Sequence, residues 1–319
     1  MKRRDFIAGL GGAAAWPLVA RAQQALRPVV GILQSSGLYS WAPFLEGLKE
    51  EGFVDGQNVL IEIRSAEGQY DSFPALVADL VHRNVSVIVA AGAVSLPLAA
   101  KAATTTIPIV FMIGSDPVQW GLVSSFNRPG GNITGMTIID TTLAPKRLEL
   151  IREVVPSATL MALLVNPNNP NAQPQIEELE ALARASGLTL RVVNVQTESD
   201  LAPAFENLVR DRADAVMIAS DAFLGGMSGQ IAALAERFKV PVIFPFPVPG
   251  GLMAYGISLK EMSHQMGKYT GRILKGERPS DLPVMQSTKV ELTINLKTAK
   301  ALGLTFPPTL LARADEVIE

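Results

Sequence analysis

The chain has 319 residues, 48% hydrophobic and 18% charged, with a formal net charge of −2. At roughly 100–200 residues per domain this length predicts about two domains, and the composition excludes a disordered chain and gives no basic bias toward nucleic acid. With no cysteine and only two histidines, His82 and His264, disulfides, thiolate nucleophiles and Cys-type zinc sites are excluded, and little is left for histidine-based catalysis.

The first 22 residues have the pattern of an export signal. A positive start, M-K-R-R-D-F-I, precedes an apolar run of about a dozen residues, and A-R-A forms a small-x-small cleavage site before Gln23. The paired arginines resemble a twin-arginine signal, with a general secretory signal as the alternative. The run is shorter than the roughly 20 residues that span a membrane. We predict cleavage after Ala22 and a periplasmic protein, whose residues 23–319 carry 24 basic and 29 acidic residues, net −5.

From residue 28 onward, short apolar runs alternate with helical periodicities. Strands are predicted over residues 29–34, 59–64, 85–91 and 107–113, and helices over 41–52, 73–83 and 95–104. Short β-branched runs separated by helices of about 10–15 residues indicate βαβ units and a parallel sheet.

The same pattern repeats in the second half. Helices are predicted over 146–154, 172–185, 199–210 and 228–237, and strands over 159–166, 188–195, 215–219 and 240–244. The predicted fold class is therefore α/β, with two doubly wound parallel-sheet lobes rather than one large sheet.

The tail is too short to form a third domain. It contains a predicted long helix (259–276), a strand (290–295) and a short helix (298–303), which must dock on the two lobes. The chain then crosses between lobes near 135–140, 256–260 and 285–290, and such a multi-crossing hinge creates a cleft. We predict a signal peptide (1–22), an N-terminal lobe (23–137 plus part of 258–290) and a C-terminal lobe (138–257 plus part of the tail).

Ligands of open α/β sheets bind beyond the carboxyl ends of the strands. Small, hydroxyl and amide residues dominate there and leave helix N-termini open to a carboxylate. Asp116 and Asp221 are candidate acceptors for a ligand amine; Asp116 fits a helix cap equally well, and for Asp221 the ligand role is favoured. The candidate contacts from strand ends are Ser35, Ser36, Tyr39, Ala93, Val94, Ser95, Ser115, Asp116, Pro117, Asn166, Asp221 and Pro245.

Aromatic residues near strand ends are candidates for stacking on a flat ligand: Tyr39, Trp41, Phe223 and Tyr255. Trp120 falls in a presumed helix and is expected to pack against the protein. No nucleotide-binding glycine motif and no nucleophile elbow occurs, and G-G-M-S-G (225–229) is predicted to be a loop entering a helix. We therefore expect no enzyme activity, no metal and no cofactor. The alternative that stays open is an enzyme whose catalytic groups are all carboxylates.

The segment S-D-P-V-Q-W-G-L-V-S-S-F-N-R-P-G-G-N-I-T-G (115–135) resembles the signature of one family of ABC-transporter substrate-binding proteins, which is related to tryptophan/tyrosine-type uptake systems. Four further segments are similar to that family: K-R-L-E-L (146–150), G-G-L-M-A-Y-G (250–256), R-I-L-K-G (272–276) and I-N-L-K-T-A-K-A-L-G-L (294–304). The resemblance covers nearly the whole of residues 23–319.

The resemblance implies a type I-like periplasmic binding protein that closes on a small molecule and delivers it to an ABC permease and its ATPase. It implies ligand contacts at Ser35 and its neighbours, at residues 93–95 and 115–117, at Asp221 and at a Tyr255–Gly256 hinge. Many relatives carry a longer, often charged loop where this chain has P-F-P-V-P (245–249), which favours an aromatic or branched carboxylate or amino acid. The alternatives are a ligand-sensing subunit for a membrane receptor and an Asp-dependent enzyme on the same scaffold.

Overall fold

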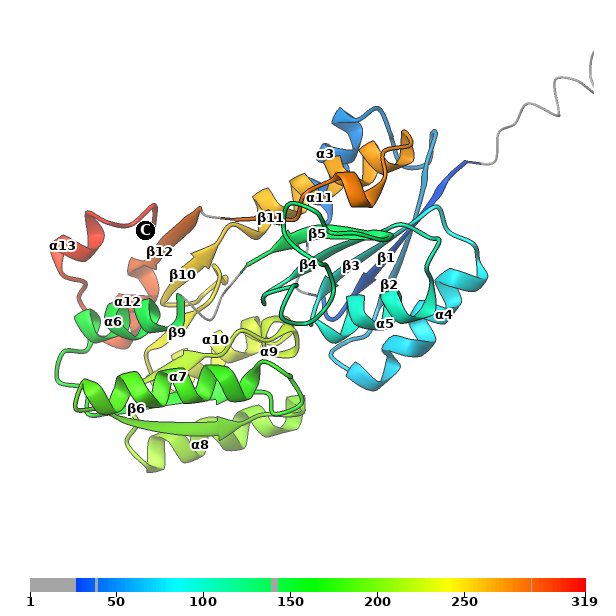
Figure 1. Ribbon diagram of the computed structural model, residues 1–319. Helices are drawn as coiled ribbons and strands as arrows, with labels where there is room; N and C mark the ends of the chain where they lie inside the picture. The colour runs from blue at the N-terminus through cyan, green and yellow to red at the C-terminus, as the bar shows by residue number, and fades with distance from the viewer. Residues whose placement is uncertain (1–26, 38–39, 139–142, 288) are drawn as a thin grey trace, which may run out of the picture.

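The computed structural model describes residues 27–37, 40–138, 143–287 and 289–319. Figure 1 shows two α/β units side by side, which we call the N-lobe and the C-lobe. The predicted export signal and Tyr39 lie outside the described residues.

The N-lobe is built on a six-stranded sheet. Its strands are β1 (Val29–Gln34), β2 (Leu60–Ser65), β3 (Val87–Gly92), β4 (Ile109–Ile113), β5 (Ile133–Thr137) and β11 (Met285–Gln286). Its helices are α3 (Ala42–Glu50), α4 (Phe73–His82), α5 (Ser95–Ala103) and α11 (Leu259–Leu274), with short 3-10 segments η1 (Tyr70–Ser72) and η4 (Pro279–Asp281).

The C-lobe is built on a seven-stranded sheet. Its strands are β6 (Leu160–Val165), β7 (Thr189–Asn194), β8 (Ala215–Ile218), β9 (Val242–Phe244), β10 (Met253–Ile257), β12 (Val290–Asn295) and β13 (Glu316–Ile318). Its helices are α6 (Ala144–Val154), α7 (Ala172–Ala185), α8 (Leu201–Arg210), α9 (Ala222–Gly226), α10 (Ser228–Phe238), α12 (Leu296–Leu302) and α13 (Pro308–Leu311), with η3 (Glu198–Asp200) before α8.

Both sheets have the doubly wound order that the sequence predicts. The N-lobe order is β11-β5-β4-β3-β1-β2 and the C-lobe order is β13-β12-β10-β9-β8-β6-β7, so the first five strands of each lobe follow the same 2-1-3-4-5 arrangement. One strand departs from the parallel prediction: β12 pairs antiparallel with β10, with Tyr255 opposite Leu292. The reason is topological, because β12 enters the C-lobe directly from the hinge without a crossover helix.

Burial on both faces explains the continuous apolar strands of the N-lobe. In β3, Ile88 and Ala90 pack in the cluster that contains α4 and α5, whereas Val87 and Val89 pack in the cluster that contains α3 and α11. Alternate side chains of a strand point to opposite faces, so a central strand covered by helices on both sides is apolar throughout.

A glycine contact attaches α11, from late in the chain, to α3 near the start. A β carbon on Gly267 would overlap the carbonyl oxygen of Phe44, and one on Gly47 would overlap that of His264. The two backbones therefore approach closely, and Nε2 of His264 lies within hydrogen-bond distance of the Glu50 carboxylate, at 2.9 Å, at the rim of the contact. This packing makes α11 part of the N-lobe although it follows the C-lobe strands β6 to β10 in sequence.

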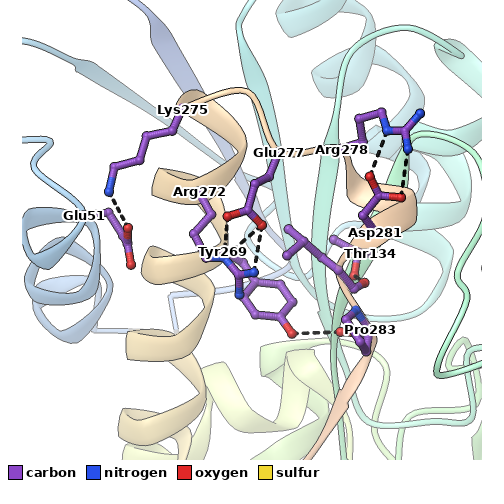
Figure 2. A network of polar contacts seen from close by, with 10 residues as sticks. Glu51, Thr134, Tyr269, Arg272, Lys275, Glu277, Arg278, Asp281 and Pro283 are labelled. Atoms are coloured by element: carbon purple, nitrogen blue, oxygen red, sulfur yellow. Dashed lines mark hydrogen bonds and ion pairs between the residues drawn. The ribbon is translucent and has the colours of Figure 1, made fainter.

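Polar contacts hold the segment that follows α11 on the same lobe (Figure 2). The Tyr269 hydroxyl donates to the carbonyl of Pro283 at 2.9 Å, and the Thr134 hydroxyl donates to that of Leu282 at 2.6 Å. Thr134 belongs to β5, so these bonds place the segment along the sheet edge where β11 then pairs with β5. The chain reaches its third crossing from this position.

The sheet memberships require three links between lobes: β5 to α6, β10 to α11, and β11 to β12. All three leave or enter at strands near the sheet edges that face each other in Figure 1. Three separate links between the same two lobes restrict the relative motion of the lobes largely to opening and closing about one axis.

Several elements were missed by the sequence analysis. β5 and β10 occupy segments assigned to crossings, α9 occupies part of the predicted 225–229 loop, and Trp120 lies in a turn rather than a helix, packed against the N-lobe core. Both missed strands contain a glycine, which weakens a strand signal. The glycines are required by close packing, since a β carbon on Gly135 or Gly256 would overlap the backbone of Phe111 or Pro245.

Replacing Gly267 by alanine is expected to destabilise the protein by about 1–3 kcal/mol, because the added methyl group meets rigid backbone. The matched control is Gly229→Ala in α10, where the added carbon meets nothing within 4 Å. There alanine is expected to stabilise by up to about 1 kcal/mol through helix propensity. Urea unfolding of the two variants measures both effects, and equal stabilities would contradict the α3–α11 contact.

Candidate functional site

A cavity of about 90 Å³, partly open to solvent, lies between the lobes at the carboxyl ends of their strands. Most of its lining is apolar, with polar side chains confined to the C-lobe. It is lined by Gly92, Ala93, Met112, Ile113, Gly114, Ile138, Asn169, Asn171, Ser220, Asp221, Ala222, Pro245, Phe246, Ile257 and Leu259. We call this cavity the cleft.

Three of the residues predicted from strand ends line the cleft: Ala93, Asp221 and Pro245. Ala93 follows β3 in the N-lobe, whereas Asp221 follows β8 and Pro245 follows β9 in the C-lobe. The residues predicted from strand ends thus include members of both lobes that line one cavity, as expected for the edges of two facing parallel sheets.

Other predicted residues support the cleft from behind. The fully buried Ser35 hydroxyl accepts from the backbone N–H of Ala93 at 2.9 Å and ties the end of β1 to the end of β3. The Asp116 carboxylate accepts from the N–H of Val118 at 2.8 Å and of Gln119 at 3.3 Å, which is the capping role weighed for it. Pro117 is buried in the turn that Asp116 caps.

The two predicted hinge residues, Tyr255 and Gly256, make the following contacts through their backbone rather than through a side chain. The carbonyl of Tyr255 accepts from the Arg147 guanidinium at 2.7 Å, and Gly256 allows β10 to approach the backbone of Pro245. Neither residue is among those that line the cleft.

Three predicted serines carry buried hydroxyls that find no hydrogen-bond partner within the described part of the chain: Ser36, Ser95 and Ser115. Ser95 begins α5, whose N-cap position is held by Val94, a residue that offers no side-chain acceptor or donor. Ser115 follows Gly114 of the cleft lining. Buried polar groups are normally paired, so these three hydroxyls are unusual, but none of the three residues is among those that line the cleft.

Asp221 is the most unusual group of the cleft, since its carboxylate is almost entirely buried. It accepts from the Tyr70 hydroxyl at 2.6 Å, from the N–H of Leu224 at 2.8 Å and from the Asn166 amide at 3.4 Å. Burial raises the pKa of Asp221 above its ordinary value, and these three donors offset only part of that rise. The ionised carboxylate is thus only partly compensated by the protein groups around it.

Sequence analysis missed Arg147, although it lies in the quoted K-R-L-E-L segment. This arginine is 1% exposed and donates to the Tyr255 carbonyl and, at 3.4 Å, to the Ser220 hydroxyl. Its position behind Ser220 comes from α6 packing on β8 and β10, which no local pattern reveals.

Tyr70 was also missed, because it lies in the segment between β2 and α4 rather than at a strand end. The Tyr70 ring stacks on that of Phe73, three residues later, at 5.3 Å between ring centroids. This nearby aromatic residue is the local sequence feature that could have indicated an ordered Tyr70 side chain. The hydrogen-bond partner of Tyr70, Asp221, is 151 residues away in sequence and belongs to the other lobe.

Within the described residues, no group of three or more His, Asp or Glu side chains is placed to hold a metal ion. No helix in the same part of the chain has the length and apolar character needed to cross a membrane.

The comparisons with known proteins agree with this geometry. The profile of the ABC transporter substrate binding protein family matches residues 28–318, which is most of the chain. The chain belongs to this family of substrate-binding proteins. Its two doubly wound lobes are those of a type I periplasmic binding protein.

Three relatives illustrate the similarity. A tyrosine-binding protein of Clostridioides difficile is 27% identical over 82% of this chain and 75% of its own. An ABC domain from Streptococcus pneumoniae in complex with L-Trp is 26% identical, with a TM-score of 0.79 over 92% of this chain and 100% of that one. A ligand-free, open substrate-binding protein with adhesive properties from Clostridium difficile is 25% identical, with a TM-score of 0.62 over 91% and 99%. By TM-score, the present structure is thus more similar to the L-Trp complex than to the ligand-free, open protein.

Replacing Asp221 by asparagine is expected to raise the melting temperature of the ligand-free protein at neutral pH. A carboxyl with a raised folded-state pKa stabilises the fold below its ordinary pKa and loses that contribution as pH rises through the folded-state pKa. Asparagine keeps a cap for α9 without the buried charge. Melting curves from about pH 4 to about pH 8 should show the advantage of the variant growing with pH. A constant difference across this range would contradict the raised pKa.

Proposed function

We propose that this chain is the solute-binding component of an ABC import system and captures an amino acid with an aromatic or branched apolar side chain in the cleft. The observation that carries this proposal is the buried Asp221 carboxylate in a largely apolar cavity whose described lining includes no basic side chain. A zwitterion with an apolar side chain matches both features.

The ligand ammonium group is assigned to Asp221. The carboxylate already accepts from three uncharged donors of the protein, and it has further lone pairs for an ammonium group. A charge-assisted hydrogen bond in a buried site is stronger than a neutral one, and it removes the cost of an uncompensated buried charge.

The ligand carboxylate is assigned to the N-lobe wall. Backbone N–H groups of the first turn of a helix have no partner within the helix, and they carry the positive end of the helix dipole. At the start of α5 the Leu96 N–H already donates to the Ala93 carbonyl at 3.0 Å and Pro97 has no N–H, which leaves the N–H groups of Val94 and Ser95 as the candidate donors, next to the buried Ser95 hydroxyl. An anion therefore finds donors there without a basic side chain.

The ligand side chain is assigned to the apolar part of the cleft. Met112 and Ile113 of β4 face this space with Phe246 of the C-lobe. Ile138, Ile257 and Leu259, at the two nearby lobe crossings, add to the same wall. Two of the relatives described above bind tyrosine or were solved with L-Trp, amino acids with aromatic side chains, and this supports the assignment.

The test is calorimetric titration of residues 23–319 with L-tryptophan and L-tyrosine. Asp221→Asn is expected to weaken binding at least ~30-fold, because it removes the partner of a buried charged group. L-tryptophanamide, which lacks the carboxylate, and indole-3-propionate, which lacks the ammonium group, are expected to bind the unsubstituted protein more weakly than L-tryptophan.

Asp221→Asn should leave the affinity for indole-3-propionate unchanged or improve it, since that ligand offers no ammonium group. Equal binding of L-tryptophan by the variant and the original protein would overturn the ammonium assignment. Recovery of a chemically altered ligand after incubation would favour an enzyme over a binding protein.

We further infer that the protein acts in the periplasm with an inner-membrane permease and ATPase, after export by a twin-arginine signal. The support is the sequence of residues 1–22 and the family to which the chain belongs. Replacing Arg3 and Arg4 by lysine should leave the precursor in the cytoplasm if the twin-arginine route is used, whereas a general secretory signal should still export it. Cell fractionation with detection of the mature protein separates the two routes.

A further inference from the structure

The two lobes touch through α9 of the C-lobe. Its N-cap residue Asp221 accepts the hydroxyl of Tyr70, which belongs to the N-lobe, at 2.6 Å. At the other end of the helix, a β carbon built on Gly226 would lie 3.0 Å from Cβ of Ser36. In Figure 1 α9 lies on the side of the C-lobe that faces the N-lobe.

A third contact lies between these two. Gly68 of the N-lobe has φ +80°, and a β carbon there would lie 2.7 Å from the Phe223 ring in α9. Only glycine adopts this backbone conformation without strain and leaves room for the ring. Phe223, which the sequence placed among the aromatic candidates for ligand stacking, therefore packs against the opposite lobe.

We propose that Tyr70 and α9 form the latch that holds the lobes closed, with Tyr70 as a positioning residue that acts through Asp221. The latch consists of the Tyr70–Asp221 hydrogen bond and the close contacts of Gly68 with Phe223 and of Ser36 with Gly226. It rests on the proposed function only in that Asp221 is also the residue assigned to the ligand ammonium group.

The latch couples ligand capture to closure through one carboxylate. Opening the cleft would separate Tyr70 from Asp221, because the two residues belong to different lobes. Closing buries the carboxylate, which favours any partner that compensates for its lost hydration. Tyr70 supplies one such partner from the N-lobe, and a ligand cation would supply another, so each makes the other's binding more favourable in the closed arrangement.

The ring of Tyr70 is held in position before closure. It stacks on Phe73 with an interplanar angle of 29°, and Phe73 is 2% exposed in the N-lobe core. A donor held in place by its own lobe loses little conformational freedom when it meets its acceptor. The hydrogen bond therefore contributes to closure with a small entropic cost.

The absence of cysteine from the sequence allows a direct trap of the closed arrangement. With Ser36→Cys and Gly226→Cys, the two β carbons would lie 3.0 Å apart, so a shift of about half an ångström reaches disulfide geometry. A mild oxidant should then link the lobes, detected by gel mobility and by mass. The matched control combines Ser36→Cys with Gly229→Cys, since nothing lies within 4 Å of a β carbon at Gly229.

The second arm tests Tyr70 itself in the trap background. Tyr70→Phe should slow disulfide formation about tenfold, the effect of removing a hydrogen bond to a charged group. Tyr269→Phe is the control, because its hydroxyl bonds to Pro283 inside the N-lobe (Figure 2). That variant should lower the melting temperature without changing the rate of disulfide formation.

The latch is overturned if the Ser36–Gly226 cysteine pair fails to cross-link in the folded protein, if the control pair cross-links equally fast, or if Tyr70→Phe leaves the rate unchanged. Adding L-tryptophan separates this proposal from the proposed function. Acceleration by L-tryptophan supports both. A Tyr70-dependent rate that L-tryptophan does not change upholds the latch and overturns the ligand class.

Discussion

The close approach of α11 to α3 is the contact on which the two-lobed arrangement depends. Gly267 and Gly47 let the helix backbones meet, and this draws the segment that follows the first five C-lobe strands, β6 to β10, back onto the N-lobe. The chain must then cross between the lobes a third time to complete the C-lobe with β12 and β13. One helix–helix contact thus determines how many links join the lobes, and the links restrict how the lobes move.

The cleft contains a carboxylate that a protein selected only for stability would not keep. Asp221 is buried among apolar groups and its pKa is raised by that burial, so its ionised form opposes folding at neutral pH. The surrounding donors Tyr70, Asn166 and Leu224 reduce this opposition without removing it. The proposed ligand ammonium group would complete the compensation, and this is the reason we propose for a destabilising group in the cleft.

The two walls of the cleft carry different chemical groups. The N-lobe lining consists of small and apolar residues, and the C-lobe lining adds the Asp221 carboxylate and the amides of Asn169 and Asn171. Neither lobe alone surrounds the apolar space between them. A ligand that spans both walls therefore favours the closed arrangement, and the same ligand is released when the walls separate.

The α/β class, the doubly wound arrangement and most element positions can be predicted from the sequence, because short apolar runs and helical periods are local patterns. Ala93, Asp221 and Pro245 could also be predicted to line one cavity, since strand ends of a parallel sheet gather at one edge. The folded structure was needed to see that Ser35 and Asp116 bond to backbone while Tyr70 and Arg147 reach the cleft region. Those roles depend on partners up to 151 residues away, and pairing across that distance is set by how the lobes pack rather than by any local period.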